Sequence, residues 1–266
     1  REVDPKDVHE LQQNGNEQRN MGVGGFTELD RAFSQERNET TFRLSESGSI
    51  KGRYRNELRF EFTDEDLQYS SATQGLAINV LDSFNIGGAQ RAGGVRTREV
   101  EIADNFDFTI GKKHALRTGI EMEHSRLRAD ELTNNLGTYT FESLADYNAG
   151  LPGQFSRREG NALVEYSNTE FAWYINDDIR LRKNVMMSLG VRYEAQSLLS
   201  DYNNFAPRAH VTWSPFKSAK TTFRAGAGIF YDWYDTGLYE DTLRVNGVNQ
   251  QDIIINYPCY PDPRAC

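Results

Sequence analysis

The sequence predicts an all-β fold, namely a segment of an antiparallel transmembrane β-barrel with about eight long strands joined in hairpins. Apolar and polar residues alternate with period two over segments of about 12 to 16 residues, well beyond the length of a typical soluble strand. The connections between these segments alternate between short turns and long loops. No run of about 18 apolar residues occurs, so a membrane-spanning helix is not expected.

The composition agrees with a barrel and disfavours other classes of protein. Of the 266 residues, 38% are hydrophobic and 12% are aromatic, and the mean hydropathy is −0.69. This hydropathy is low for a two-sided core, whereas the aromatic content argues against disorder. The net charge of −9 argues against a nucleic-acid partner, because phosphate binding needs a basic surface.

Residues 1–36 are expected to form a loop and a weak strand entry. Residues 1–19 are polar and irregular, without a starting Met or a signal peptide, and the chain ends on "PDPRAC". We therefore expect a piece of a longer protein.

Residues 37–235 are expected to hold the barrel strands. In "RYRNELRFEFTDED", which follows a turn near Gly48 to Gly52, three apolar residues alternate with charged ones: Leu58, Phe60 and Phe62. A Gly-, Ser- and Ala-rich stretch then covers 67–94. The next pair of strands, "TREVEIADNFDFTI" and "HALRTGIEMEHSRL", flanks a turn at Gly111 to Lys113.

A second long insert, residues 128–161, contains "FESLADYNAGLPG", whose helix-like spacing ends at Pro152. The strands "EYSNTEFAWYINDDIRL" and "VMMSLGVRYEAQS" flank a turn at Arg182 to Asn184. "FAPRAHVTWSPF" then leads through a turn at Lys217 to Ala219 into "TTFRAGAGIFYDWYD", which we expect to be a strand over residues 221–235. Residues 236–266 are expected to form an extracellular loop.

A bilayer explains this arrangement better than a soluble β-sandwich, whose strands are shorter. Lipid would contact the apolar face and a wet lumen the polar face, while hairpin pairing satisfies the backbone. The short turns should share one end, periplasmic by barrel convention. The long loops, around 67–95, 129–161, 200–204 and 235–266, should share the extracellular end.

Aromatic residues near the strand ends indicate a girdle at the membrane surface. Amphipathic rings favour the headgroup level, and although one such Trp would more often fill a core, five on neighbouring apolar registers favour a girdle. They are Trp173, Tyr193, Trp213, Tyr231 and Trp233.

The segments "TEFAWYINDDIRLRKNVMMSLGVRYE" and "DYNNFAPRAHVTWSPFKSAKTTFRAGAGIFYD" also carry a family likeness. They resemble the barrel of TonB-dependent outer-membrane receptors, most closely the Oar-like group with a carboxypeptidase-regulatory-like N-terminal domain. Four linked motifs over Thr169 to Asp232 carry the resemblance. Two positions depart from it: Asn176-Asp177-Asp178-Ile179 lacks the expected Trp, and Gly226-Ala227-Gly228 replaces Gly-Tyr-Gly.

The resemblance implies a fragment of a receptor in the outer membrane of a Gram-negative bacterium. Such barrels have about twenty-two strands, and the sequence shows no plug domain, TonB box or C-terminal aromatic strand. Receptors of this kind capture a scarce ligand, such as a siderophore, glycan or peptide. They import it with the proton-motive force, relayed by the TonB system through the plug.

The alternative is a small complete outer-membrane barrel or a surface adhesin without energy coupling. Four glycines on the expected lumen face would fill a narrow interior poorly and therefore favour a wide barrel with a plug: Gly119, Gly190, Gly226 and Gly228.

Catalytic, metal and cofactor sites are not expected. Asp177 and Asp178 are adjacent in a strand and face opposite sides, and His114 and His124 are about 33 Å apart along a strand. Glu121 and Glu123 share a face, where a hydrated lumen wall explains them better than a cation site. "GGAQRAGG" lacks the context of a phosphate loop. We expect no enzyme.

Ligand capture is expected in the loops, where six aromatic residues offer stacking surfaces: Tyr139, Phe141, Tyr147, Phe155, Tyr234 and Tyr239. The alternative is that these rings only pack the loops together. The insert from Leu136 to Phe155 is the favoured capture loop, because it is longer than closure requires. Cys259 and Cys266 suggest a loop-closing disulfide, the alternative being two unrelated thiols.

Overall fold

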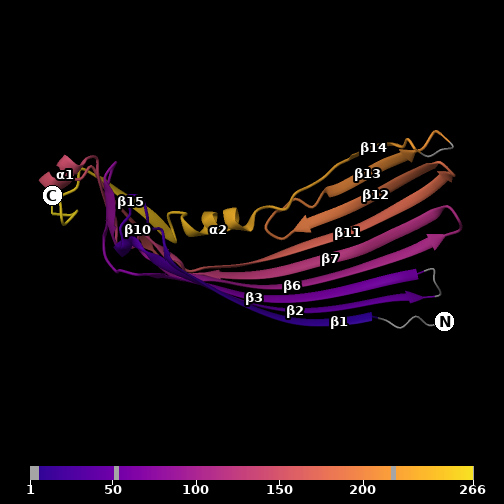
Figure 1. Cartoon of the computed structure of the whole chain (residues 1–266), viewed down its shortest axis with the longest axis horizontal. Coiled ribbons are helices and arrows are strands. Elements are labelled where there is room, and N and C mark those ends of the chain that lie inside the picture. The colour runs from indigo at the N-terminus through magenta and orange to yellow at the C-terminus, as the bar shows by residue number, and fades with distance from the viewer. Residues whose placement is uncertain (1–5, 51–53, 217–219, 266) are drawn as a thin grey trace.

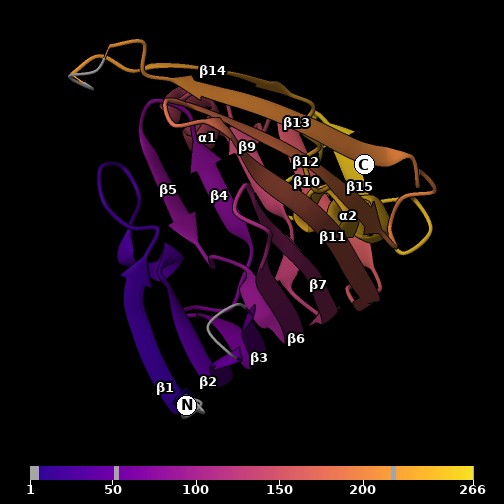
Figure 2. The ribbon, with the colours of Figure 1, turned by 90° about the vertical axis from the view of Figure 1, so that its right-hand side faces the viewer.

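The computed structural model describes residues 6–50, 54–216 and 220–265. Strands that follow one another along the wall pair antiparallel in the order β1-β2-β3-β6-β7-β11-β12-β13-β14, with a short strand β8 beside β6. In Figure 2 this sheet curves from β1 round to β14, and the two edge strands lie apart. The strands of the wall are β1 (Lys6–Met21), β2 (Phe33–Ile50), β3 (Tyr54–Ser71), β6 (Arg91–Ile110), β7 (His114–Ala129), β8 (Leu132–Thr133), β11 (Val164–Arg182), β12 (Val185–Gln196), β13 (Asn204–Trp213) and β14 (Phe223–Gly228).

A second sheet, which we call the loop sheet, gathers strands from three different loops in the order β15-β10-β9-β4-β5. It lies at the end of the wall opposite the N-terminus (Figure 1). Its strands are β4 (Ala77–Val80), β5 (Phe84–Gly87), β9 (Thr138–Phe141), β10 (Gln154–Gly160) and β15 (Gln250–Asn256). The helices are the 3₁₀ turn η1 (Leu29–Arg31), α1 (Leu144–Ala149) and α2 (Thr236–Arg244). No helix among the described residues is long and apolar enough to cross a membrane.

An apolar band crosses one face of the wall. The register places apolar residues opposite one another on five neighbouring strands: Leu44, Phe60, Ile102, Met122 and Phe171. Their side chains stay open to the surroundings, with Met122 at 45% exposure. An exposed apolar belt on an antiparallel wall is the surface that lipid requires, so this face points outward.

The opposite face is polar and lies under the loops. Tyr166 on β11 donates its hydroxyl to the carbonyl oxygen of Thr236 at 2.9 Å. The side chain of Gln196 on β12 bonds the backbone N–H of Tyr234 at 2.9 Å and its carbonyl oxygen at 3.1 Å. Because segments that follow β14 cover this face, it is the lumen side of the wall.

Two lumen-face glycines sit beneath neighbouring side chains. A Cβ at Gly119 would lie 2.8 Å from the ring of Tyr174, and one at Gly190 would overlap the amide oxygen of Asn176. These glycines therefore admit side chains from β11 and do not leave open space. The inference of a wide lumen from their small size does not hold at these two positions.

Two boundaries differ from the sequence prediction at the N-terminal side. Residues 6–21, expected to be irregular, form β1 and pair with β2 along nearly the whole strand. Residues 67–71 and 91–95, expected in a loop, belong to β3 and β6. β1 crosses the apolar band but is polar along most of its length, whereas β3 and β6 continue past the band as a polar wall. In both cases alternation of apolar residues gives no signal.

The last strand is shorter than the sequence suggests. β14 ends at Gly228, so Tyr231 and Trp233 lie outside the strand in which the girdle prediction placed them. Ile229 still donates its N–H to the carbonyl oxygen of Pro207 at 3.0 Å. Pro207 has no N–H to return the bond, so the ladder stops there.

The other three girdle candidates lie on the outward face. Trp173 is opposite Tyr193 toward the loop end, while Trp213 is opposite Phe223 beside the short turns. The rings of Trp213 and Phe223 are 6.0 Å apart. Their role at the membrane surface stays a prediction.

The hairpins and the helix-like insert agree with the sequence analysis. Turns at 111–113 and 182–184 lie at the same end of the wall (Figure 1). The turn at 217–219 lies outside the described residues, and the turn near 48–52 is described only to residue 50. Helix α1 begins after Ser143, which caps the N–H of Asp146, and ends at Gly150, whose φ is 67°. Residues 236–266, expected as a loop, contain α2 and β15.

Substitutions on the two faces of β12 should differ in cost. Val191 lies on the apolar face between Ile175 and Pro207, whereas Ser188 bonds Asp178 on the lumen face. Val191→Arg should destabilise the assembled barrel by about 2–4 kcal/mol if Val191 lies near the bilayer midplane, and Ser188→Arg by much less. Urea titration in lipid vesicles measures both. Equal losses would contradict the assignment of faces.

The orientation of the wall can be tested on intact cells. Lys112→Cys in the β6–β7 turn should react with a membrane-impermeant maleimide only after permeabilisation, because short barrel turns face the periplasm. Asp201→Cys, in the exposed β12–β13 connection at the opposite end, should react without it and serves as the control. Labelling of residue 112 on intact cells would reverse the assignment.

Candidate functional site

The loop sheet encloses a small aromatic core of its own. Val80, Tyr139, Phe141 and Phe155 form this core, and both Tyr139 and Phe141 are 0% exposed. Tyr139 and Phe155 stack with ring centroids 4.8 Å apart. The hydroxyl of Tyr139 donates to the carbonyl oxygens of Cys259 and Pro261, at 3.2 and 2.9 Å. The core thus joins strands from two loops to the C-terminal segment.

This burial corrects the sequence prediction for three candidate ligand contacts. Tyr139, Phe141 and Phe155 are interior residues of the loop sheet and present no ring to a ligand. The physical reason is that each loop strand is too short to bury an apolar face alone, so the strands pack on one another. For these residues the alternative of loop packing applies. The insert from Leu136 to Phe155 consequently supplies β9, α1 and the start of β10.

Two of the remaining candidates pack against other rings, and the third is held through its backbone. Tyr147 meets Phe84 and Phe141 edge to face, each at 5.2 Å. Tyr239 of α2 contacts the ring of Tyr166 at 5.2 Å. Tyr234 is held through its backbone by Gln196. Apart from the pair Phe141 and Tyr147, these contacts join segments far apart in the chain and were therefore not visible in the sequence.

A groove at the outer end of the loop sheet is the feature best suited to ligand contact. Its volume is about 330 Å³, and it runs between the α1–β10 connection and the segment after β15. Tyr257 is 80% exposed beside it, and Leu151 is 65% exposed. Two carboxylates also reach it. The lining residues are Glu142, Asp146, Leu151, Pro152, Gly153, Tyr257 and Pro258.

The backbone of Tyr257 is held in an unusual conformation. Its φ is 53°, in the left-handed region that costs a non-glycine residue about 1–2 kcal/mol. Its N–H donates to the carbonyl oxygen of Gly153 at 2.8 Å, which ties the two sides of the groove together. The conformation keeps a large ring in solvent. Tyr257 is not among the residues predicted from the sequence, because nothing local marks "NYPCY" as a binding segment.

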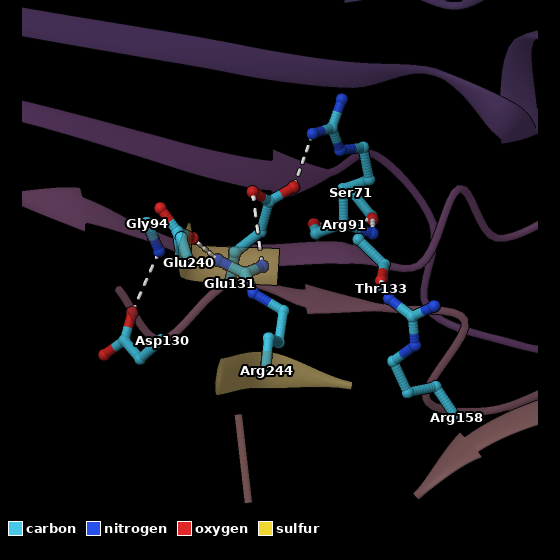
Figure 3. A network of polar contacts seen from close by, with 9 residues as sticks. All are labelled: Ser71, Arg91, Gly94, Asp130, Glu131, Thr133, Arg158, Glu240 and Arg244. Atoms are coloured by element: carbon cyan, nitrogen blue, oxygen red, sulfur yellow. Dashed lines mark hydrogen bonds and ion pairs between the residues drawn. The ribbon is translucent and has the colours of Figure 1, made fainter. Parts of the chain in front are cut away.

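A buried polar network anchors α2 to the wall (Figure 3). Glu131, just after β7, pairs with Arg91 at the start of β6 and lies 3.9 Å from Arg244 of α2. Arg244 also pairs with Glu240 one turn earlier. The two cations and two carboxylates balance, so the desolvated charges are compensated. The backbone N–H of Gly94 donates to the side-chain carboxylate of Asp130 at 2.9 Å.

Acidic residues line the lumen face of the wall. The register sets four carboxylates directly opposite one another on neighbouring strands: Glu61, Glu101, Glu123 and Glu170. Arg43 bonds the first of them at 2.7 Å. Opposed like charges are unfavourable unless hydrated or paired, which fits a wet lumen. Within residues 6–50, 54–216 and 220–265, no group of three His, Cys, Asp or Glu residues could hold a metal ion.

The other residues considered from the sequence as catalytic or metal-binding candidates do not come together in one site. Asp177 contacts the Nδ1 atom of His114 at 2.7 Å on the outward face, while Asp178 bonds Ser188 on the lumen face. His124 lies further along β7 and contacts Thr169 at 2.8 Å. Cys259 is disulfide-bonded, and Cys266 lies outside the described residues, so the pairing of the two stays a prediction.

The edge of the loop sheet depends on one carboxylate. Arg158 on β10 donates two hydrogen bonds to Asp252 on β15, at 2.8 and 2.9 Å. These bonds hold the pKa of the Asp252 carboxyl below its usual value. A depressed folded-state pKa stabilises the sheet above the unfolded pKa of about 3.9. That contribution is lost as the pH falls through the folded value.

The β10–β15 edge should therefore loosen in acid. We expect amide protection of Ile253 to Ile255, corrected for intrinsic exchange, to fall as the pH drops below about 4, because Asp252 becomes protonated. Asp252→Asn should remove this pH dependence at a cost of about 0.2–1 kcal/mol at neutral pH, since the pair is partly exposed. Hydrogen exchange measures it, with Glu28→Gln as control. Unchanged pH dependence in Asp252→Asn would contradict this role.

Comparison with known proteins places the wall in a family. The search of curated proteins found no match. Among solved structures, the chain is similar to the outer membrane transporter YddB from Escherichia coli, with a TM-score of 0.57 and 14% sequence identity. The likeness covers 84% of this chain and 29% of that one, and it shows the shared fold. The chain thus spans less than a third of that transporter's length.

Residues 11–201 match the family described as outer membrane beta barrel domain. This match covers β2 to β12 and most of β1, which together carry most of the apolar band. The localisation of this wall is the outer membrane. The chain therefore belongs to the outer membrane β-barrel domain family.

Proposed function

We propose that this chain forms part of the wall and extracellular loops of a TonB-dependent outer-membrane receptor. The receptor captures a scarce ligand and imports it with the proton-motive force. The observation that carries the proposal is the folded loop sheet with its open groove, standing at the end of a polar-lined wall. The linked motifs over Thr169 to Asp232 support the same family.

A wide barrel supports this function better than a small closed one. Among the described strands, β1 and β14 each pair on one side only, and they lie apart in Figure 2. Further strands would close such a wall around a lumen large enough for a plug. The plug would face the acidic lumen wall and transmit the pull of the TonB system. The wall has a transport role in this proposal and no enzymatic one.

The groove is proposed as the capture site because it joins an exposed ring, apolar side chains and two carboxylates. Tyr257 offers a face for stacking, and Leu151 adds apolar area beside it. Glu142 and Asp146 would accept hydrogen bonds or a positive charge. Such a surface suits a siderophore, a glycan or a peptide with polar groups along one edge.

Uptake experiments in a strain lacking the gene test this function. Each ligand class, as ferric siderophore, glycan or peptide, is supplied as the sole source of its nutrient. The wild-type gene should restore uptake of one class, and a protonophore should abolish that uptake. Tyr257→Ala/Leu151→Ser should lower uptake about tenfold at limiting ligand, as expected when exposed anchors are lost.

The matched control is Val248→Ser, which removes an apolar side chain that is 88% exposed and does not line the groove. It should leave uptake unchanged. Uptake that survives the protonophore would contradict energy coupling. If the strain that lacks the gene takes up every ligand class normally but loses surface adhesion, the small barrel or adhesin would be favoured instead.

A further inference from the structure

Four arginines form a compact block on the wall. Arg96 lies directly opposite Arg128, and Arg98 directly opposite Arg126, on the paired strands β6 and β7. Like charges opposite one another in a sheet are unfavourable. Two such pairs in succession therefore call for a compensating negative charge.

The block lies on the outward face, just beyond the apolar band. Arg128 is opposite Glu165 on the outward register of β11. Arg98 precedes the apolar Val100 by two residues, about 7 Å along the strand. The block is on the side of the band that leads to the long loops. In an outer-membrane barrel this is the level of the outer-leaflet headgroups.

Neighbouring carboxylates compensate only part of this charge. Asp64 bonds Arg96 at 2.6 Å and lies 3.6 Å from Arg98. Glu165 pairs with Arg128 at 3.0 Å. Asp66, opposite Arg96, brings the acidic residues of this patch to three against four arginines.

Arg126 is the arginine of the block that has no carboxylate partner. Within the described part of the chain, the guanidinium group of Arg126 has no hydrogen bond and no ion pair, although its backbone pairs with β6 and β11. A cavity of about 370 Å³ opens over the block, lined by the four arginines and Glu165. Guanidinium groups at this spacing suit a phosphate, which they can bind through paired hydrogen bonds.

We propose that this block binds the phosphorylated headgroup of an outer-leaflet lipid. A lipid uses both surfaces at once, because its phosphates reach the guanidinium groups while its acyl chains lie along Val100, Ile102 and Met122. A soluble anion would use only the first surface. Basic pockets next to a membrane-spanning surface bind lipid headgroups for the same reason. The inference rests on the membrane location of the wall and is independent of the imported ligand.

The test compares lipid retention by the full-length protein in detergent, measured by native mass spectrometry. Added probes are bisphosphorylated lipid A, the same lipid without phosphates, and inorganic phosphate. The wild type should retain one phosphorylated lipid, and Arg98→Gln/Arg126→Gln should retain it at least about tenfold more weakly. Arg55→Gln/Arg59→Gln, which removes equal charge from the lumen face, should bind as the wild type does.

Three results would overturn the proposal. Equal retention of the lipid by the wild type and by Arg98→Gln/Arg126→Gln would show that the block is not the binding site. Equal retention of the lipids with and without phosphates would show that the phosphates are not recognised. Displacement of the lipid by an equal concentration of inorganic phosphate would identify a soluble-anion site. If the double variant does not assemble, Arg126→Gln alone, which breaks no ion pair, gives the same comparison with a smaller expected loss.

Discussion

The cross-strand hydrogen-bond ladder is the constraint on which the rest of the structure depends. In lipid, every backbone N–H and C=O must find a partner within the protein. From β2 to β12 the ladder runs without a slip until residue 180, and this keeps the apolar band and the polar lumen face apart. A shift of one residue in any of these pairings would turn Phe60 or Met122 toward water and a glutamate toward lipid.

Beyond the apolar band a different kind of packing takes over. The loops bury a small aromatic core around Tyr139 and Phe141, while Arg91, Glu131 and Arg244 tie them to the wall. A buried pair of cations and carboxylates is costly to break from one side. The loop sheet is therefore a folded platform with a core of its own, and the segment that carries α2 is tied to the wall through defined contacts.

The two proposed binding surfaces use different faces and different chemistry. The groove beside Tyr257 is open to the exterior and combines an exposed ring with carboxylates. The arginine block lies on the lipid side, where Arg126 has no protein partner. Their separation means that lipid contacts can hold the wall in the membrane without occupying the surface proposed for ligand capture.

The sequence alone determined the features that depend on neighbours within one strand or turn. Alternation in Leu58, Phe60 and Phe62 identified a two-faced strand, the short turn at 111–113 identified a hairpin, and the helix-like spacing before Pro152 identified α1. The tertiary structure decided what depends on residues far apart in the chain. The parallel pairing of β4 with β9 buried Tyr139, Pro207 ended the ladder of β14, and the pairing of β6 with β7 gathered the arginines. Periodicity records which face a side chain takes, but contact between distant segments is set by packing and pairing that no local pattern encodes.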